Sequence, residues 1–84
     1  GGMPGAEHLR DSLPLIEILE KQKASKKLYG AICAAPAVVL ASKDLIQGTA
    51  TCYPSKAFRQ TIASASDDAV VVSDNVITSQ GPVR

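Results

Sequence analysis

A short apolar run that leads at once into a helix-forming segment is the feature that most restricts the fold of this chain. Residues 28–32 have the length and flanks of a buried strand. Residues 34–42 are dense in Ala, Val and Leu, and Pro36 is tolerated in a first helical turn. A strand that runs directly into a helix is typical of α/β folds, so we expect layers of helix around a sheet.

Four further segments have patterns that predict local structure. A helix is predicted from Ser12, a suitable N-cap, with Pro14 in its first turn and one apolar arc on its surface. A second strand is predicted over residues 50–53, and residues 55–68 are predicted to be a loop with room for one helical turn. Two β-branched runs around residues 73–75 predict a hairpin. The apolar arc consists of Leu15, Ile16, Ile18 and Leu19.

This order predicts an α/β fold with a largely parallel sheet, but one that is incomplete. The chain has 84 residues, whereas single domains usually have about 100–150. A buried parallel sheet needs helices on both faces, and only two segments have a strong helical pattern. We therefore expect residues 1–84 to be part of one larger domain.

Composition and charge exclude several classes of protein. The net charge is +1, and the basic residues form no long run with aromatic residues between them, so nucleic-acid binding is not expected. Two cysteines and one histidine are too few for a disulfide framework or a structural zinc site. No signal peptide is visible, and residues 31–41 are too short to span a bilayer. A cytoplasmic location is the default, or an organelle if a targeting segment lies upstream.

The candidate reactive residue is Cys33, which lies between the predicted strand and helix. A side chain at such a junction sits on a sharp turn above the sheet edge, and small neighbours allow that turn. The helix N-terminus favours a thiolate and can stabilise an oxyanion. The competing interpretation is a buried structural cysteine, which is common. Cys52 is interpreted as a core residue within the second strand, and His8 as a surface or capping residue ahead of the first helix.

Four ordered segments carry a resemblance: residues 1–7 with 9–12, residues 29–37, residues 50–54 and residues 76–82. They resemble the ThiJ/PfpI family, in its DJ-one-like branch. The first resembles the segment after a central strand of that family, the second resembles its nucleophile elbow, and the others resemble two later family segments. The resemblance runs over nearly the whole chain, apart from residues 55–68 and the last two.

The resemblance implies a flavodoxin-like three-layer α/β sandwich and a homodimer in the full-length protein. It also implies chemistry without a cofactor or a metal. The Cys33 thiolate would attack a reactive dicarbonyl and convert methylglyoxal to lactate, as a glutathione-independent glyoxalase of the lyase or hydrolase type; deglycase activity is also implied. The amides of Gly2 and Ala34 would bind the oxyanion, and Tyr53 would lie beside the substrate.

The chain departs from the family pattern in three ways. The family's general acid/base is a glutamate from the N-terminal part of the domain, and Glu7 does not match its position. Tyr53 stands where many members have histidine, and a tyrosine does not titrate near neutral pH. The C-terminal helix of the family is not found before Arg84, which should leave apolar surface exposed.

Three functional interpretations remain. The first is a dicarbonyl-detoxifying parent enzyme for which this chain supplies half of the site and is inactive alone. The second is a redox-sensing or chaperone-like stress protein that acts through oxidation of Cys33. The third is an inactive truncated chain.

Overall fold

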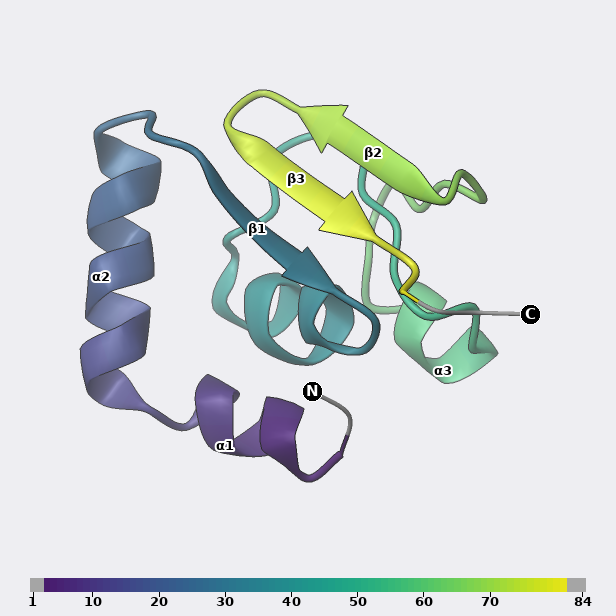
Figure 1. The fold of residues 1–84 in the computed structure, drawn as a ribbon, viewed down its shortest axis with the longest axis horizontal. Coiled ribbons are helices and arrows are strands. Elements are labelled where there is room, and N and C mark those ends of the chain that lie inside the picture. Colours follow the sequence, from purple (N-terminus) through teal and green to yellow (C-terminus); the bar gives the residue numbers. More distant parts are fainter. Residues whose placement is uncertain (1–2, 82–84) are drawn as a thin grey trace.

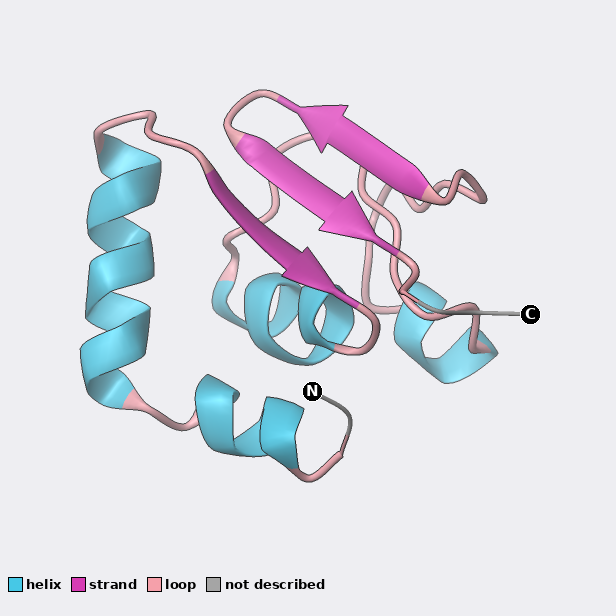
Figure 2. Cartoon of the chain, viewed as in Figure 1, coloured by secondary structure: helices cyan, strands magenta, loops and turns pink. Residues whose placement is uncertain are grey.

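The computed structural model describes residues 3–81 (Figures 1 and 2). Its elements follow the predicted order, except that a helix is added at the start and the strand predicted over residues 50–53 is absent from the described residues. The helix predicted from Ser12, the strand ahead of Cys33 and the hairpin are all confirmed. The helices are α1 (Gly5–Arg10), α2 (Leu13–Ala24), the π-helix η1 (Pro36–Leu40), the 3-10 helix η2 (Ala41–Lys43) and α3 (Lys56–Arg59). The strands are β1 (Tyr29–Ile32), β2 (Val70–Ser73) and β3 (Val76–Ser79).

The sheet has three strands in the order β1-β3-β2. β1 runs parallel to β3, with Tyr29 opposite Val76, and β2 runs antiparallel to β3, with Val72 opposite Ile77. The turn between β2 and β3 places Asp74 at φ 54°, a left-handed conformation that aspartate tolerates better than most residues. The α/β class is confirmed, and in the described residues the sheet is mixed, with one parallel and one antiparallel pairing.

The segment from residue 35 to residue 43 is helical as predicted, and it carries the centre of the core. Four of the five residues of η1 are buried. On one side of η1 lies a cluster that includes Ile16, Leu40 and Leu45; on the other lies a cluster that includes Ala50 and Cys52. The Tyr29 hydroxyl donates a hydrogen bond to the Leu45 carbonyl, which ties the loop after η2 to β1. This packing holds the end of β1 in place.

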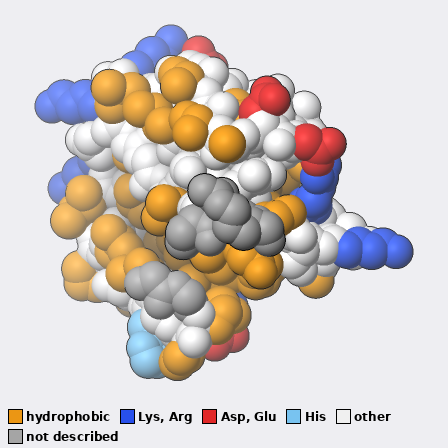
Figure 3. Space-filling model, turned by 45° about the vertical axis from the view of Figure 1, so that its right-hand side comes forward, with side chains coloured by type: hydrophobic (Ala, Val, Ile, Leu, Met, Phe, Trp, Pro, Cys, Tyr) orange, Lys and Arg blue, Asp and Glu red, His pale blue; other side chains and the backbone are white. Residues whose placement is uncertain are grey.

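The opposite face of the sheet is apolar and exposed. Because side chains alternate along a strand, the residues that point away from the core line one surface across all three strands. Their exposed fractions range from 37% to 66%. Figure 3 shows hydrophobic side chains exposed at several places on the view that it draws, with charged side chains mostly at the outline of the molecule. Exposed apolar surface was expected for a chain without the family's covering helix. The residues are Ile32, Val70, Val72 and Ile77.

The prediction of a strand over residues 50–53 is wrong. Ala50 makes a single bridge, to Ala65, and no strand continues from it. The Thr51 amide donates instead to the Thr78 side-chain oxygen, 3.0 Å away. The Thr78 side chain thus accepts from the amide that would have donated within a β-ladder. Cys52 is therefore not within a strand, although it is a core residue as predicted, with 2% of its surface exposed.

Two expectations at the start of the chain also need correction. His8 does not precede the first helix but lies within α1, where it is exposed. The predicted arc on α2 is buried only in part, because Ile16 is buried while Ile18 is 59% exposed.

Within residues 3–81, none of the helices combines the length and the apolar character needed to cross a membrane.

Replacing Gly30 with alanine should destabilise the chain by about 1–3 kcal/mol, the usual cost of overpacking. A Cβ at this position would lie 2.9 Å from the Ile77 carbonyl oxygen, so β1 and β3 would have to separate. The measurement is urea unfolding followed by circular dichroism. Gly5→Ala is the matched control, since a Cβ there meets nothing within 4 Å. Equal stabilities for the two variants would contradict this account of β1–β3 packing.

Candidate functional site

Cys33 occupies a strained turn between β1 and the helix that contains η1. Its φ is 63°, in the left-handed region that non-glycine residues rarely adopt and that costs of order 1–3 kcal/mol. Its side chain is half-buried. Ala34, directly after Cys33, is small, as predicted for such a tight turn, whereas the residue directly before it is Ile32. Backbone strain of this kind is concentrated at functional sites.

Two hydrogen bonds hold the Cys33 backbone in this conformation. Its amide donates to the Ser79 carbonyl at 3.0 Å, which extends the pairing of β1 with β3. Its carbonyl accepts from the Tyr53 amide at 2.7 Å. Both main-chain polar groups of Cys33 are therefore engaged by segments far away in the sequence, and the turn cannot relax without breaking them.

Gly81 closes the site from the end of β3. It has a φ of 88°, and a Cβ at this position would lie 3.2 Å from the Cys33 Cβ. Glycine is needed here both for the backbone conformation and for the close approach. Gly81 lies in the last of the segments that resemble the family, and the sequence alone indicates no role for it. The Gly-Pro pair was the available signal, and the contact with Cys33 could be found only in three dimensions.

The predicted neighbours of Cys33 are placed in part. Ala34 is 3% exposed and lies in the turn that opens the helix, where amides lack partners within the helix. Tyr53 meets Cys33 through its backbone, while its ring lies 6.5 Å from the Phe58 ring in an edge-on arrangement. Gly2 lies outside the described residues. The structure thus brings together Cys33, Tyr53 and Gly81 at the carboxyl ends of two parallel strands, which is the usual place for sites in α/β sheets.

The second cysteine has a different environment. Burial raises the pKa of the Cys52 thiol; Arg59 acts in the opposite direction, and the charge of Cys33 adds a smaller upward effect. Cys52 should therefore stay protonated at neutral pH, and the thiol form is a poor nucleophile. Within residues 3–81, no group of three or more His, Cys, Asp and Glu side chains is arranged to hold a metal ion.

Iodoacetamide at neutral pH should therefore label Cys33 at least about 100-fold faster than Cys52, because Cys52 is both buried and protonated. Peptide mapping by mass spectrometry measures the two rates in one sample. The difference should disappear in urea, where both thiols are exposed. Equal labelling of the folded chain would show that the core around Cys52 opens as readily as the Cys33 turn.

Known proteins share the sequence pattern and the fold of this chain. The sequence matches the DJ-1/PfpI family over residues 1–84. The chain belongs to this family. Its fold matches the solved structure "Toxoplasma gondii DJ-1, oxidized" with a TM-score of 0.89 and 46% identity, over 98% of this chain and 45% of that one. Drosophila melanogaster DJ-1beta matches with a TM-score of 0.83 and 36% identity, over 98% and 45%.

Among curated family members, Protein DJ-1 homolog B of Arabidopsis thaliana is 43% identical over 83 residues, 98% of this chain and 19% of that protein. Glutathione-independent glyoxalase DJR-1.2 of Caenorhabditis elegans is 40% identical over 83 residues, 96% of this chain and 44% of that protein. The chain thus spans less than half the length of these relatives. The family and the α/β fold expected from the sequence are confirmed.

Proposed function

We propose that this chain carries the nucleophile of a cofactor-free site that converts reactive dicarbonyls, with methylglyoxal as the representative substrate and lactate as the product. The observation that carries the proposal is the strained Cys33 turn, with φ 63° at the end of β1 and the start of a helix. A relative that is 40% identical bears the name glutathione-independent glyoxalase, which supports this reaction over other thiol chemistry.

The proposed reaction balances without an oxidant or a reductant. The Cys33 thiolate adds to the aldehyde carbon, and the carbonyl oxygen takes a proton to give a hemithioacetal. A base moves the proton on that carbon to the neighbouring carbon through an enediol, which leaves a thioester of lactate. Water hydrolyses the thioester and releases lactate and the thiol. The sum is methylglyoxal plus water giving lactate.

The residues around Cys33 have separate roles in this proposal. The Ala34 amide, at the helix N-terminus, and the Gly2 amide stabilise the oxygen that becomes negative when the thiolate attacks. Tyr53 lies beside the substrate, and its hydroxyl can donate a hydrogen bond to a carbonyl. The proton between the two carbons is moved by a glutamate outside this chain, as the family resemblance implies. Residues 1–84 are therefore half of a site.

The test is a chimera in which residues 1–84 replace the matching segment of the C. elegans relative. This design supplies the remainder of the domain from a protein that is 40% identical across the joined region. The chimera is expected to form lactate from methylglyoxal without glutathione, as measured by a coupled lactate assay. A folded chimera that binds methylglyoxal but makes no lactate would contradict the enzymatic proposal.

Oxidation sensing is a second candidate function. Cys33 is half-buried, so small oxidants have access to it, and a related structure is that of an oxidised Toxoplasma gondii protein. In this role peroxide converts the thiolate to a sulfenate and a second equivalent gives the sulfinate, with water as the other product.

For this second function, one equivalent of peroxide after another should add 16 and then about 32 Da at Cys33, with Cys52 unchanged. Intact mass and peptide mapping of the chimera measure this. A sensor would show the sulfinate without lactate turnover, whereas an enzyme would show turnover that the oxidation abolishes. Oxidation at Cys52 before Cys33 would contradict the assignment.

For the full-length protein we propose a homodimer in the cytoplasm, without a nucleic-acid or membrane partner. The exposed apolar face of the sheet supports association with further protein surface. Light scattering of the chimera, compared with the C. elegans relative, tests the dimer.

A further inference from the structure

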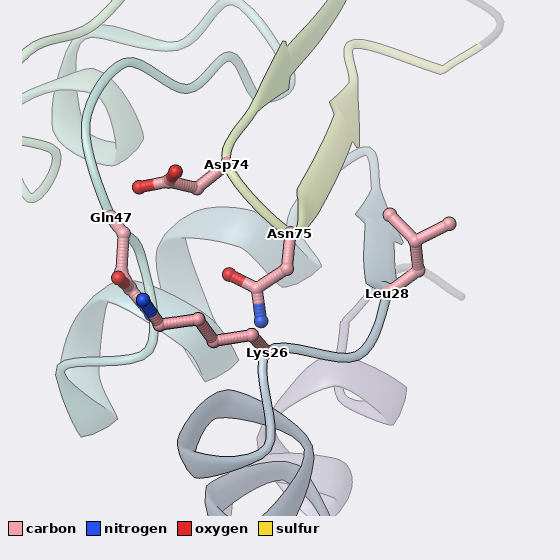
Figure 4. A pocket seen from close by; sticks show the side chains of 5 residues that line it. All are labelled: Lys26, Leu28, Gln47, Asp74 and Asn75. Carbon is pink, nitrogen blue, oxygen red and sulfur yellow. The ribbon is translucent and has the colours of Figure 1, made fainter.

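A pocket lies at the end of β1 opposite to Cys33. It has a volume of about 290 Å³ and is lined by residues from three separate segments (Figure 4). Cys33 follows the last residue of β1, whereas this pocket lies beside the residues that precede β1 and at the β2–β3 turn. It is therefore distinct from the candidate active site. The lining residues are Lys26, Leu28, Gln47, Asp74 and Asn75.

Asn75 is the fixed wall of this pocket. Only 7% of its surface is exposed. Its side-chain amide nitrogen donates to the Lys27 carbonyl at 2.9 Å, and its main-chain carbonyl accepts from the Tyr29 amide at 3.0 Å. Its side-chain oxygen accepts no hydrogen bond within residues 3–81. Because the buried side-chain nitrogen and oxygen atoms of these residues all have partners, this oxygen is open to solvent at the pocket (Figure 4). A ligand donor there replaces water at an acceptor that is held in a fixed position, which gives a modest net gain.

The pocket also has one cationic and one anionic side chain, and the residues that carry them have left-handed backbone conformations. Lys26, at φ 57°, follows α2, and Asp74, at φ 54°, lies in the hairpin turn. The Ser73 hydroxyl donates to the Gln47 carbonyl at 2.9 Å, which joins the loop that carries Gln47 to the hairpin. Figure 4 shows the Asp74 carboxylate and the Gln47 amide on the same side of the pocket, with the Lys26 side chain extending toward Gln47.

From this arrangement we infer that the pocket binds a small zwitterion of the free α-amino-acid class. The ligand's ammonium group is held by the Asp74 carboxylate and the Asn75 side-chain oxygen. Its carboxylate is held by the Lys26 ammonium, with the Gln47 amide as a second donor. Leu28, which is 64% exposed, offers apolar contact to an aliphatic side chain of the ligand.

The balance of charges distinguishes this ligand class from simpler ions. An anion such as phosphate would pair with Lys26 but lie against the Asp74 carboxylate, and a simple cation would lie against Lys26. A ligand with both charges satisfies both residues and the unpaired Asn75 oxygen. The volume of about 290 Å³ is at the small end for ligand pockets, which suits a molecule of this size.

The test is an NMR titration of the isotope-labelled 84-residue chain with L-valine. We expect saturable shifts of the Asn75 and Gln47 side-chain NH₂ signals, with a Kd of about 1 mM or lower. Isovalerate lacks the ammonium group of valine, and isobutylamine lacks its carboxylate. Each should bind about tenfold more weakly, because one charged hydrogen-bonding group is lost. If the isolated chain gives a poorly dispersed spectrum, the same titration is performed on the chimera.

Variants complete the test. Asp74→Asn and Lys26→Gln should each raise the Kd for valine by about tenfold. Asp44→Asn is the control for the first, since Asp44 has a similar φ of 57° and does not line the pocket. Lys27→Gln is the control for the second. The inference is overturned if valine causes no saturable shifts, if either fragment binds as tightly as valine, or if the control variants weaken binding as much as the pocket variants do.

Discussion

In the chimera with the C. elegans relative, replacing Cys33 with alanine should lower the rate of lactate formation from methylglyoxal by at least about 1,000-fold, the scale of loss when a covalent nucleophile is removed. The hemithioacetal and the thioester of lactate cannot form without the Cys33 sulfur. The residual rate should equal that of free methylglyoxal in buffer. The measurement is kcat/KM from the coupled lactate assay.

Cys52→Ser is the matched control for this experiment. Cys52 is the other cysteine, and it is buried and outside the strained turn. Its replacement should leave kcat/KM within about threefold, although it will lower stability because a hydroxyl replaces a buried thiol. Turnover that survives in Cys33→Ala but is lost in Cys52→Ser would show that the nucleophile is Cys52 and not Cys33. Turnover that survives in both would exclude covalent thiol chemistry.

The isolated 84-residue chain should be about 10²–10⁴-fold less active than the chimera, because a positioned general acid or base typically contributes that factor. The chain holds the thiol but spans less than half of the relatives, and the family's glutamate is expected in the part that it does not span. Initial rates at equal molar concentrations of the chain and the chimera measure the ratio, with circular dichroism to show that both are folded.

Glu7→Gln in the chimera separates two explanations of any residual activity. Glu7 lies in α1 and is half-buried, and it does not match the family position of the general base. Its replacement should leave kcat/KM unchanged. A fall of 100-fold or more would show that Glu7 performs the proton transfer. Equal rates for the isolated chain and the chimera would contradict the view that residues 1–84 are half of a site.

The turn at Cys33 was predicted correctly because the pattern that indicates it is local. Cys33 sits between an apolar strand and a helix with Pro36 in its first turn, and that pattern is legible in a window of a dozen residues. The Gly81 contact was not predicted, because the β1–β3 pairing brings it to Cys33 from 48 positions away. The pocket around Asn75 was missed for the same reason, since its polar groups come from three separate loops.

Local chemistry also explains which elements were predicted correctly. The β-branched residues around Asp74 and Asn75 form the hairpin, and Ser12 with Pro14 marks the start of α2. The short helix α1 was missed because its six residues span fewer than two turns and begin with a glycine, so they carry little helical pattern. A six-residue helix with so weak a pattern is stabilised by packing and not by propensity.

The sequence by itself thus determined the α/β class, the hairpin and the strand–helix junction at Cys33, because each depends on side chains close together along the chain. Tertiary structure alone decided the rest. Residues 50–53 resemble a strand, but the Thr78 hydroxyl accepts the Thr51 amide and only Ala50 pairs. The packing of distant segments also brings the Tyr53 amide and Gly81 into contact with Cys33. These outcomes depend on which backbone and side-chain groups reach the same donor or the same space, and that competition is settled only when distant segments pack.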